Sequence, residues 1–201
     1  MKRIKSIDVV WRDRKRRTGR PCILGRSLKV KYVVQLGSGS DKLSPQELAN
    51  TYGLSLLQVH SALAYYYLHQ SEVDSEFEED RLFSEKLETL GEEAAQDWYV
   101  SRPIPANGLP IDAPPRTESI DLIYSDPEVH GGRPCLLGSD RSVTDIVMRH
   151  QQTADDEETA NHFEIDLAHF HAAMSYYYLH QAEIDADIAA VTDRLERERL
   201  V

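Results

Sequence analysis

The densest group of reactive side chains is a basic segment near the start of the chain, in the loop expected between two short strands. Its cations are Arg12, Arg14, Lys15, Arg16, Arg17 and Arg20. Guanidinium and ammonium groups at this density bind phosphate oxygens or an acidic protein surface. Residues 1–36 hold twelve Lys/Arg against two Asp, a net of +10, so with −11 overall the remaining residues carry −21. Two interpretations stay open. The segment contacts nucleic acid or an acidic partner, or it is solvated or pairs with the chain's own acidic helices.

A second group consists of two tyrosine triplets, each expected on a helix. They are Tyr65, Tyr66, Tyr67 and Tyr176, Tyr177, Tyr178. Three consecutive aromatic rings on a helix point in three directions, so at least one must leave the local core. Tyrosine suits interfaces because it has a large apolar ring and a polar tip. We predict that the triplets pack copy against copy or subunit against subunit. The alternative, a platform that stacks nucleic-acid bases, lacks the interleaved basic residues such platforms use.

The sequence gives little support for a metal-binding site or for an enzyme active site. His69 with Glu72, and His180 with Glu183, are three apart on expected helices and could supply four ligands where the copies meet. A hydrogen-bonded surface pair is the commoner outcome, so we predict no metal site. Phosphate loops, nucleophile elbows, Cys-x-x-Cys and HExxH motifs are absent from the sequence. We therefore expect no enzyme, no cofactor and no small-molecule substrate, and we expect Cys22 and Cys135 to be buried thiols.

The elements that hold these groups occur twice. Residues 6–34 match residues 119–147 with 12 identities in 29, at an offset of 113. Residues 49–74 match residues 160–185 with 13 identities in 26, at an offset of 111. Collinear matches at this density predict a tandem duplication, with two residues lost from the second copy near the equivalent of 37–42.

Each copy is predicted to form a short β-hairpin followed by three helices. In the first copy the strands are 7–11 and 21–24, and a short helix begins at Val30. Ser44, with Glu47 three residues on, caps a helix over 45–51, which Gly53 ends. Ser55 then starts a longer helix that continues past Val73. In the second copy the caps are Asp155 and Asp166, and Glu164 replaces the turn glycine, which predicts a less regular turn.

A short helix, a tight turn and a longer helix are the ingredients of a helix-turn-helix. The first exposed positions expected on its recognition helices are Gln58, His60, Ser61, His169 and His171. None is Arg or Lys, the residues that read guanine edges and grip phosphates. Any affinity for DNA must therefore come from the basic segment.

Between the copies lies an acidic stretch and then a proline-rich one. An amphipathic helix is predicted to about Tyr99, with a break near Gly91, followed by an irregular linker over 103–115. We divide the chain into three parts. Residues 1–82 form a first module, residues 83–117 an acidic helix and linker, and residues 118–201 a second module. The sequence contains no apolar run long enough for a membrane span and no signal peptide, so we expect a cytoplasmic protein.

Residues 126–138 read Asp-Pro-Glu-Val-His-Gly-Gly-Arg-Pro-Cys-Leu-Leu-Gly. This run resembles the signature of domain-of-unknown-function family 433 (DUF433), and the resemblance extends over about 6–80 and 119–190. The family pattern continues with a Thr-Arg pair that both copies lack, having Arg26-Ser27 and Ser139-Asp140 instead. The first copy also lacks the Asp-Pro and the first Gly, with Arg14 and Thr18 in their places.

The resemblance implies small winged or helix-turn-helix-like domains, some of which act as VapB-like antitoxins that pair with a toxin and bind operator DNA. A tandem of them implies two protomers joined as a pseudo-dimer. We therefore predict a mostly helical α+β protein, with duplex DNA, a basic protein such as a toxin, or a second copy as partners. The function predicted first is a non-enzymatic, antitoxin-like regulator that binds DNA through the basic segment. The alternative is an interaction module without DNA binding, which oligomerises through its tyrosine helices.

Overall fold

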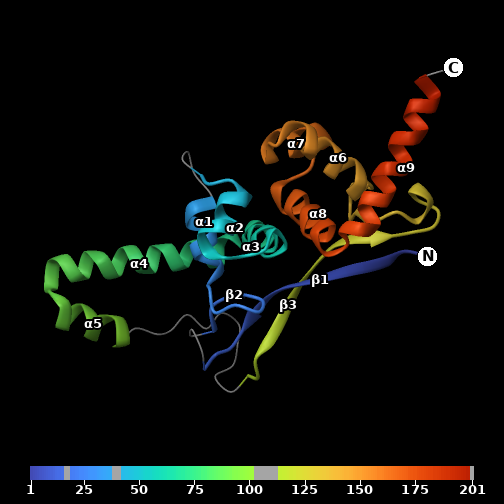
Figure 1. Ribbon diagram of the computed structural model, residues 1–201. Helices are drawn as coiled ribbons and strands as arrows, with labels where there is room; N and C mark the ends of the chain where they lie inside the picture. The colour runs from blue at the N-terminus through green and yellow to red at the C-terminus, as the bar shows by residue number, and fades with distance from the viewer. Residues whose placement is uncertain (16–18, 38–41, 102–112, 200–201) are drawn as a thin grey trace.

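The computed structural model describes residues 1–15, 19–37, 42–101 and 113–199. Helices predominate, and they pack around one antiparallel sheet (Figure 1). The predicted α+β class is confirmed. Arg16 and Arg17 of the basic segment, and most of the proline-rich linker, lie outside the described residues.

The sheet joins the two halves of the chain. Its strands are β1 (Arg3–Arg12), β2 (Cys22–Ile23), β3 (Arg116–Ser125) and β4 (Cys135–Leu136), in the order β2-β1-β3-β4. Both predicted hairpins form, since β1 pairs with β2 and β3 with β4. The long strands β1 and β3 also pair antiparallel with each other, and Ile7 lies opposite Ile120, its equivalent at an offset of 113. The central strand pair therefore belongs to both halves.

The helices follow the same order in each half. The first half has α1 (Val30–Gly37), α2 (Pro45–Tyr52), α3 (Leu56–Leu68), α4 (Gln70–Leu90) and α5 (Glu92–Ser101). The second has the short 3₁₀ turn η2 (His130–Gly132), then α6 (Val143–Thr153), α7 (Asp156–Phe163), α8 (Leu167–Leu179) and α9 (Gln181–Arg199). A single hydrophobic cluster runs through both halves, with Phe170 and Tyr65 among its largest fully buried side chains. No helix within the described ranges is long and apolar enough to cross a membrane.

The predicted caps are present. Ser44 and Ser55 each form a full capping box, with Glu47 and Gln58 as the returning side chains. In the second half, Asp155 and Asp166 accept hydrogen bonds from the backbone three residues on. These caps satisfy backbone N–H groups that would otherwise lack partners at the helix starts.

The prediction of a less regular turn at Glu164 is wrong. Gly53 has φ 62° and ψ 39°, and Glu164 has φ 56° and ψ 42°, so both turns use the left-handed conformation. The backbone path through the turn is set by the packing of the two helices, and Glu164 adopts it although it carries a Cβ.

The long helix predicted from Ser55 is also divided differently. Helix α3 ends at Leu68, and α4 begins at Gln70 after His69, whose φ is −130°. The predicted break at Gly91 is present, and α5 folds back along α4 to form a projecting arm, seen in green in Figure 1. We call α4 and α5 the acidic arm. The predicted module boundary at 82/83 falls inside α4.

Candidate functional site

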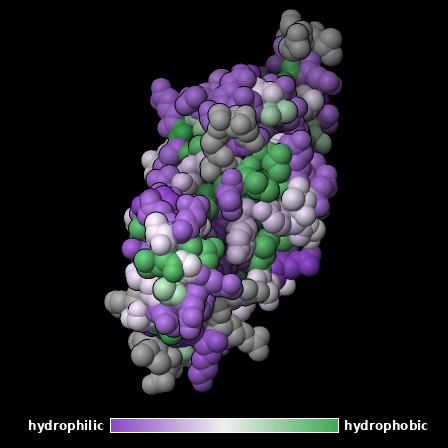
Figure 2. Space-filling model, turned by 90° about the vertical axis from the view of Figure 1, so that its left-hand side faces the viewer, coloured by the Kyte–Doolittle hydropathy of each residue, from purple (hydrophilic) through white to green (hydrophobic). Residues whose placement is uncertain are grey.

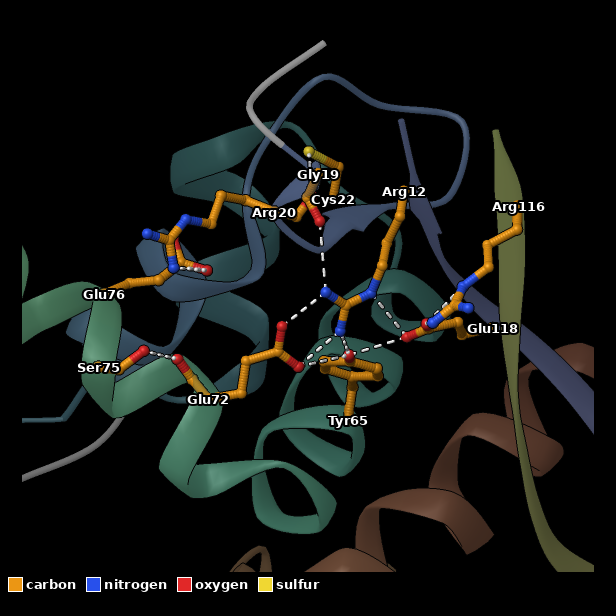
Figure 3. Close-up of polar contacts among 10 residues, drawn as sticks. All are labelled: Arg12, Gly19, Arg20, Cys22, Tyr65, Glu72, Ser75, Glu76, Arg116 and Glu118. Atoms are coloured by element: carbon orange, nitrogen blue, oxygen red, sulfur yellow. Dashed lines mark hydrogen bonds and ion pairs between the residues drawn. The ribbon is translucent and has the colours of Figure 1, made fainter. Parts of the chain in front are cut away.

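Arg12, predicted as a phosphate contact, lies inside the protein at the end of β1, with a side chain only 3% exposed. Its guanidinium donates to both carboxylate oxygens of Glu72 at 2.6 Å, in a bidentate pair with α4. Nε donates to Glu118 on β3 at 2.9 Å, and Nη2 donates to the hydroxyl of Tyr65 on α3. One arginine therefore ties together four elements that are far apart in the sequence (Figure 3).

The charges in this cluster reinforce one another. Burial lowers the pKa of Arg12, but hydrogen bonds and charge from Glu72, with Tyr65 and Glu118, outweigh burial and raise it. Burial raises the pKa of Glu118, yet hydrogen bonds from Arg12 and Arg116 leave it below its usual value. Burial also raises the pKa of Tyr65, which stays a neutral phenol. These shifts hold Arg12 and Glu118 in their charged forms and Tyr65 in its neutral form.

A second pair of buried charges lies beside the first. Arg20 is 5% exposed and pairs with Glu79, while its Nη1 lies 3.9 Å from a carboxylate oxygen of Glu76. Glu76 is 2% exposed, and neither of its oxygens has a hydrogen-bond partner among the described residues. Burial raises the pKa of Glu76, against the pull of nearby cations that include Arg20 and Lys31. Lys31 reaches Asp80 at 2.5 Å, so α4 neutralises a third cation of the N-terminal region.

The predicted nucleic-acid contacts are therefore divided. Arg12 and Arg20 bind carboxylates of the chain itself, the arrangement that the second interpretation of the basic segment describes. Arg14 is half-buried and Lys15 is exposed. Among the described members of this set, Lys15 is the exposed cation, and contact of Arg14 and Lys15 with nucleic acid stays a prediction.

The helices expected to read DNA face each other. Helix α3 packs along α8, and this pair forms the seam between the halves. His60, Ser61 and His171, expected at exposed positions, are each 2% exposed or less. Hydroxyl oxygens of Ser61 and Ser175 approach to 3.4 Å across the seam. The expectation of exposure for these three residues is wrong, because the second half covers the face that a recognition helix would present.

Each tyrosine of a triplet has a different environment. The first, Tyr65 or Tyr176, is buried and stacks on a histidine four residues on, at 4.3 Å between ring centroids, and the hydroxyl of Tyr65 donates to Glu118 on β3 of the other half at 2.9 Å. The second donates to a carboxylate eight residues on, Tyr66 to Asp74 and Tyr177 to Asp185.

The third tyrosine of each triplet reaches across the seam. Tyr67 stacks on His171 at 5.7 Å, and Tyr178 stacks on His60 at 5.6 Å. Since Tyr178 and His171 are the equivalents of Tyr67 and His60 at an offset of 111, the two contacts are reciprocal. Ring stacking across the seam, among the described residues, thus involves one tyrosine from each triplet.

The seam also contains a histidine pair that sequence reasoning missed. His60 Nδ1 lies 3.0 Å from His171 Nδ1. Burial lowers the pKa of His60 to about 3 and that of His171 well below its usual value, so both rings are neutral. The sequence could have indicated this pair, because both repeats have a histidine at the same aligned position of the long helix.

The four groups considered as metal ligands do not come together. Glu72 binds Arg12, and His180 Nδ1 lies 3.6 Å from Glu183 within the second half. In the part of the chain that the structure describes, no three His, Cys, Asp or Glu side chains are grouped to hold a metal ion. Cys22 and Cys135 are buried thiols that form no disulfide, and burial raises the pKa of Cys135 to about 11.

Comparison with known proteins gives one match. Residues 123–177 match the model of the family described as "Protein of unknown function (DUF433)". The match runs from β3 through α8 and supports the resemblance seen in the second copy. No curated protein and no solved structure matches the chain.

Proposed function

We propose, for a chain whose residues 123–177 match DUF433, a non-enzymatic function: it binds a basic partner protein through the acidic arm. The paired halves act as a pseudo-dimeric scaffold that holds the arm. This is the antitoxin-like type of interaction that the resemblance implies, with charge complementarity as its basis.

The acidic arm is the observation that carries the proposal. Residues 70–101 contain eleven Asp/Glu and two Lys/Arg, a net of −9. Three of these carboxylates face inward onto Arg12 and Arg20, and the others lie mainly on exposed positions. The face of the molecule on the arm's side is mostly hydrophilic, with separate apolar patches (Figure 2).

Exposed apolar side chains accompany this charge. They are Leu87, Leu90, Tyr99 and Val100, the last 71% exposed. Inside the arm, Phe83 packs edge-on against Tyr99 at 5.4 Å, so the two helices support each other. A charged surface with apolar side chains among its carboxylates has the composition of a protein-binding site, whose core is apolar and whose rim is polar.

The scaffold role rests on the seam. Reciprocal stacking of Tyr67 on His171 and of Tyr178 on His60 is the pattern of an isologous interface between two protomers. Burial of α3 against α8 removes the helix face that would read a major groove. The helix-turn-helix-like elements are then packing units of the pseudo-dimer.

The test compares charge reversal on the arm with matched reversal elsewhere. The arm variant carries Glu85→Lys, Glu88→Lys and Glu92→Lys, and the control carries Asp193→Lys, Glu196→Lys and Glu198→Lys on α9, all exposed positions. Each full-length variant is used to purify bound proteins from cells that make it, and a retained protein is then titrated in pure form. We expect a basic protein that binds wild type and control and loses affinity for the arm variant. Absence of any protein with this dependence contradicts the proposal.

DNA binding is the second candidate, favoured by the exposure of Lys15 and of Lys2, Arg3 and Lys5 on β1 and the residues before it. A salt-titrated binding assay on random duplex DNA separates the two functions. Affinity that falls steeply with salt, and is lost in Arg14→Glu/Lys15→Glu, supports DNA binding. No binding at low salt leaves the partner protein as the function.

A further inference from the structure

A pocket of about 500 Å³ opens at the seam, between the first turns of α2 and α7. Its walls come from both halves, with Tyr67 and Leu63 of α3 on one side and His171 and Leu167 of α8 on the other. The pocket is distinct from the Arg12 cluster and from the acidic arm.

The same place in the other half holds a smaller pocket, of about 190 Å³. Tyr178 and His60 line it where Tyr67 and His171 line the larger one. The equivalent of Gly37 at an offset of 113 is His150, whose imidazole lines the smaller pocket. A Cβ on Gly37 would lie 3.0 Å from Leu48 Cδ1 and 3.2 Å from Leu63 Cδ2, so a side chain at this position would be crowded. At this position the larger pocket is lined by a glycine and the smaller one by a histidine.

Carboxylates dominate the lining of the larger pocket. Four acidic residues, Glu47, Asp155, Asp156 and Glu157, face one cation, Lys42, a net of −3. Glu47 and Asp155 already cap helices, and Glu157 binds Lys42 at 2.5 Å. Asp156 differs, because no described residue donates a hydrogen bond to it. Its nearest described cation is His150 Nε2 at 3.7 Å, an ion-pair partner only when that ring is protonated.

The imidazole of His171 forms part of the pocket wall. His171 is 2% exposed, and its Nδ1 is bonded to His60. Its Nε2 has no hydrogen bond with any residue that the structure describes. Because one Nδ1 of the pair donates and the other accepts, His171 Nε2 is an acceptor in the tautomer whose Nδ1 carries the proton. A ligand that donates a hydrogen bond to this nitrogen would supply a bond that no described residue makes.

The pocket already stabilises one ammonium group. The hydrogen bond to Glu157 raises the pKa of Lys42, despite partial burial, and the charges of Glu157 and Asp156 act in the same direction. Lys42 occupies the rim and leaves Asp156 without a hydrogen bond.

We propose that this pocket binds a small aliphatic amine, with an ammonium group on Asp156 and the carbon chain against Tyr67 and Leu167. A second amino group of a diamine reaches the acceptor nitrogen of His171. The net negative lining selects for cations and against carboxylates and phosphates of the same size.

The experiment is calorimetric titration of the full-length protein with 1,4-diaminobutane at low salt, with 1,4-butanediol and succinate as neutral and anionic probes. We expect saturable one-site binding of the diamine alone. Asp156→Asn, which keeps the shape of the side chain, should weaken it about tenfold or more, since a charge-assisted hydrogen bond is lost. Asp193→Asn, an exposed change of the same charge on α9, should leave the affinity unchanged.

A second readout keeps the test independent of folding in the variant. In the wild-type protein, the diamine should shift the ring resonances of His171 and Tyr67 with the same dissociation constant as the calorimetry. Absence of saturable binding, equal weakening by Asp193→Asn, or full affinity in folded Asp156→Asn overturns the proposal.

Discussion

The Nδ1 atoms of His60 and His171 lie 3.0 Å apart at the centre of the seam between the halves. At this distance one ring donates and the other accepts, so the two equivalent histidines are neutral and in opposite tautomers. The seam therefore has reciprocal stacking contacts around a hydrogen bond that cannot be symmetric.

The histidine pair makes stability depend on pH. Both folded-state pKa values lie below the unfolded value near 6.5, so below that pH the unfolded chain binds more protons than the folded one. The free energy of unfolding should be steady above about pH 6.5 and fall toward pH 3, by up to about 1.4 kcal/mol per pH unit for each histidine. Urea unfolding of wild type and of His60→Leu/His171→Leu at several pH values measures the difference.

The double variant should lose part of this pH dependence because replacement of both partners leaves no unpaired polar atom. His162→Leu, at an exposed position, is the control and should titrate as wild type does. Equal pH dependence in all three proteins would show that the buried pair is not the source.

Arg12 should matter far more for stability than its neighbour Arg116. Arg12→Met leaves Glu72 without the cation that neutralises it and Glu118 with Arg116 as its remaining cation, and removal of one member of a buried ion pair costs about 3–5 kcal/mol. Arg116 is 49% exposed and its ion pair with Glu118 lies at the surface, so Arg116→Met should cost under about 1 kcal/mol. Chemical denaturation measures both, and similar losses would contradict the structural role of the cluster.

Glu164→Gly should stabilise the protein. A residue with a Cβ in the left-handed conformation costs about 1 kcal/mol, which glycine avoids. The reverse change in the other half, Gly53→Ala, should destabilise by a similar amount, because nothing lies near its Cβ position except the unfavourable φ. Thermal unfolding of the two variants should shift in opposite directions, and a lower melting temperature for Glu164→Gly would refute the argument.

The third tyrosine should be coupled to the opposite half, and the second should not. A double-mutant cycle of Tyr67→Ala with His171→Ala should give a coupling energy of about 1 kcal/mol, the value of a stacked ring pair. Tyr66 contacts Asp74 in its own half, so its cycle with His171→Ala should give a value near zero. Equal coupling energies of Tyr66 and Tyr67 with His171 would contradict the assignment of Tyr67 as the tyrosine that stacks across the seam.

Local elements of this protein were predictable because their signals lie within a few residues. Ser44 with Glu47, and Ser55 with Gln58, identified helix starts by the hydrogen bonds that their side chains make. The exception is Glu164, where turn chemistry argued from one residue was overridden by the packing of two helices. The site could not be predicted in the same way. The sequence around a cation such as Arg12 does not show whether its partner is a phosphate or a buried carboxylate.

The sequence by itself determined the repeated order of strands and helices, the helix caps and the uneven distribution of charge. Periodicity, capping and composition are properties of neighbouring residues, and they act before the chain folds. Only the tertiary structure decided that β1 pairs with β3, that α3 faces α8, and that Arg12 and Arg20 lie against α4. These contacts join residues more than 50 positions apart, and they depend on which faces bury the most apolar surface and which charges must be neutralised when that surface closes.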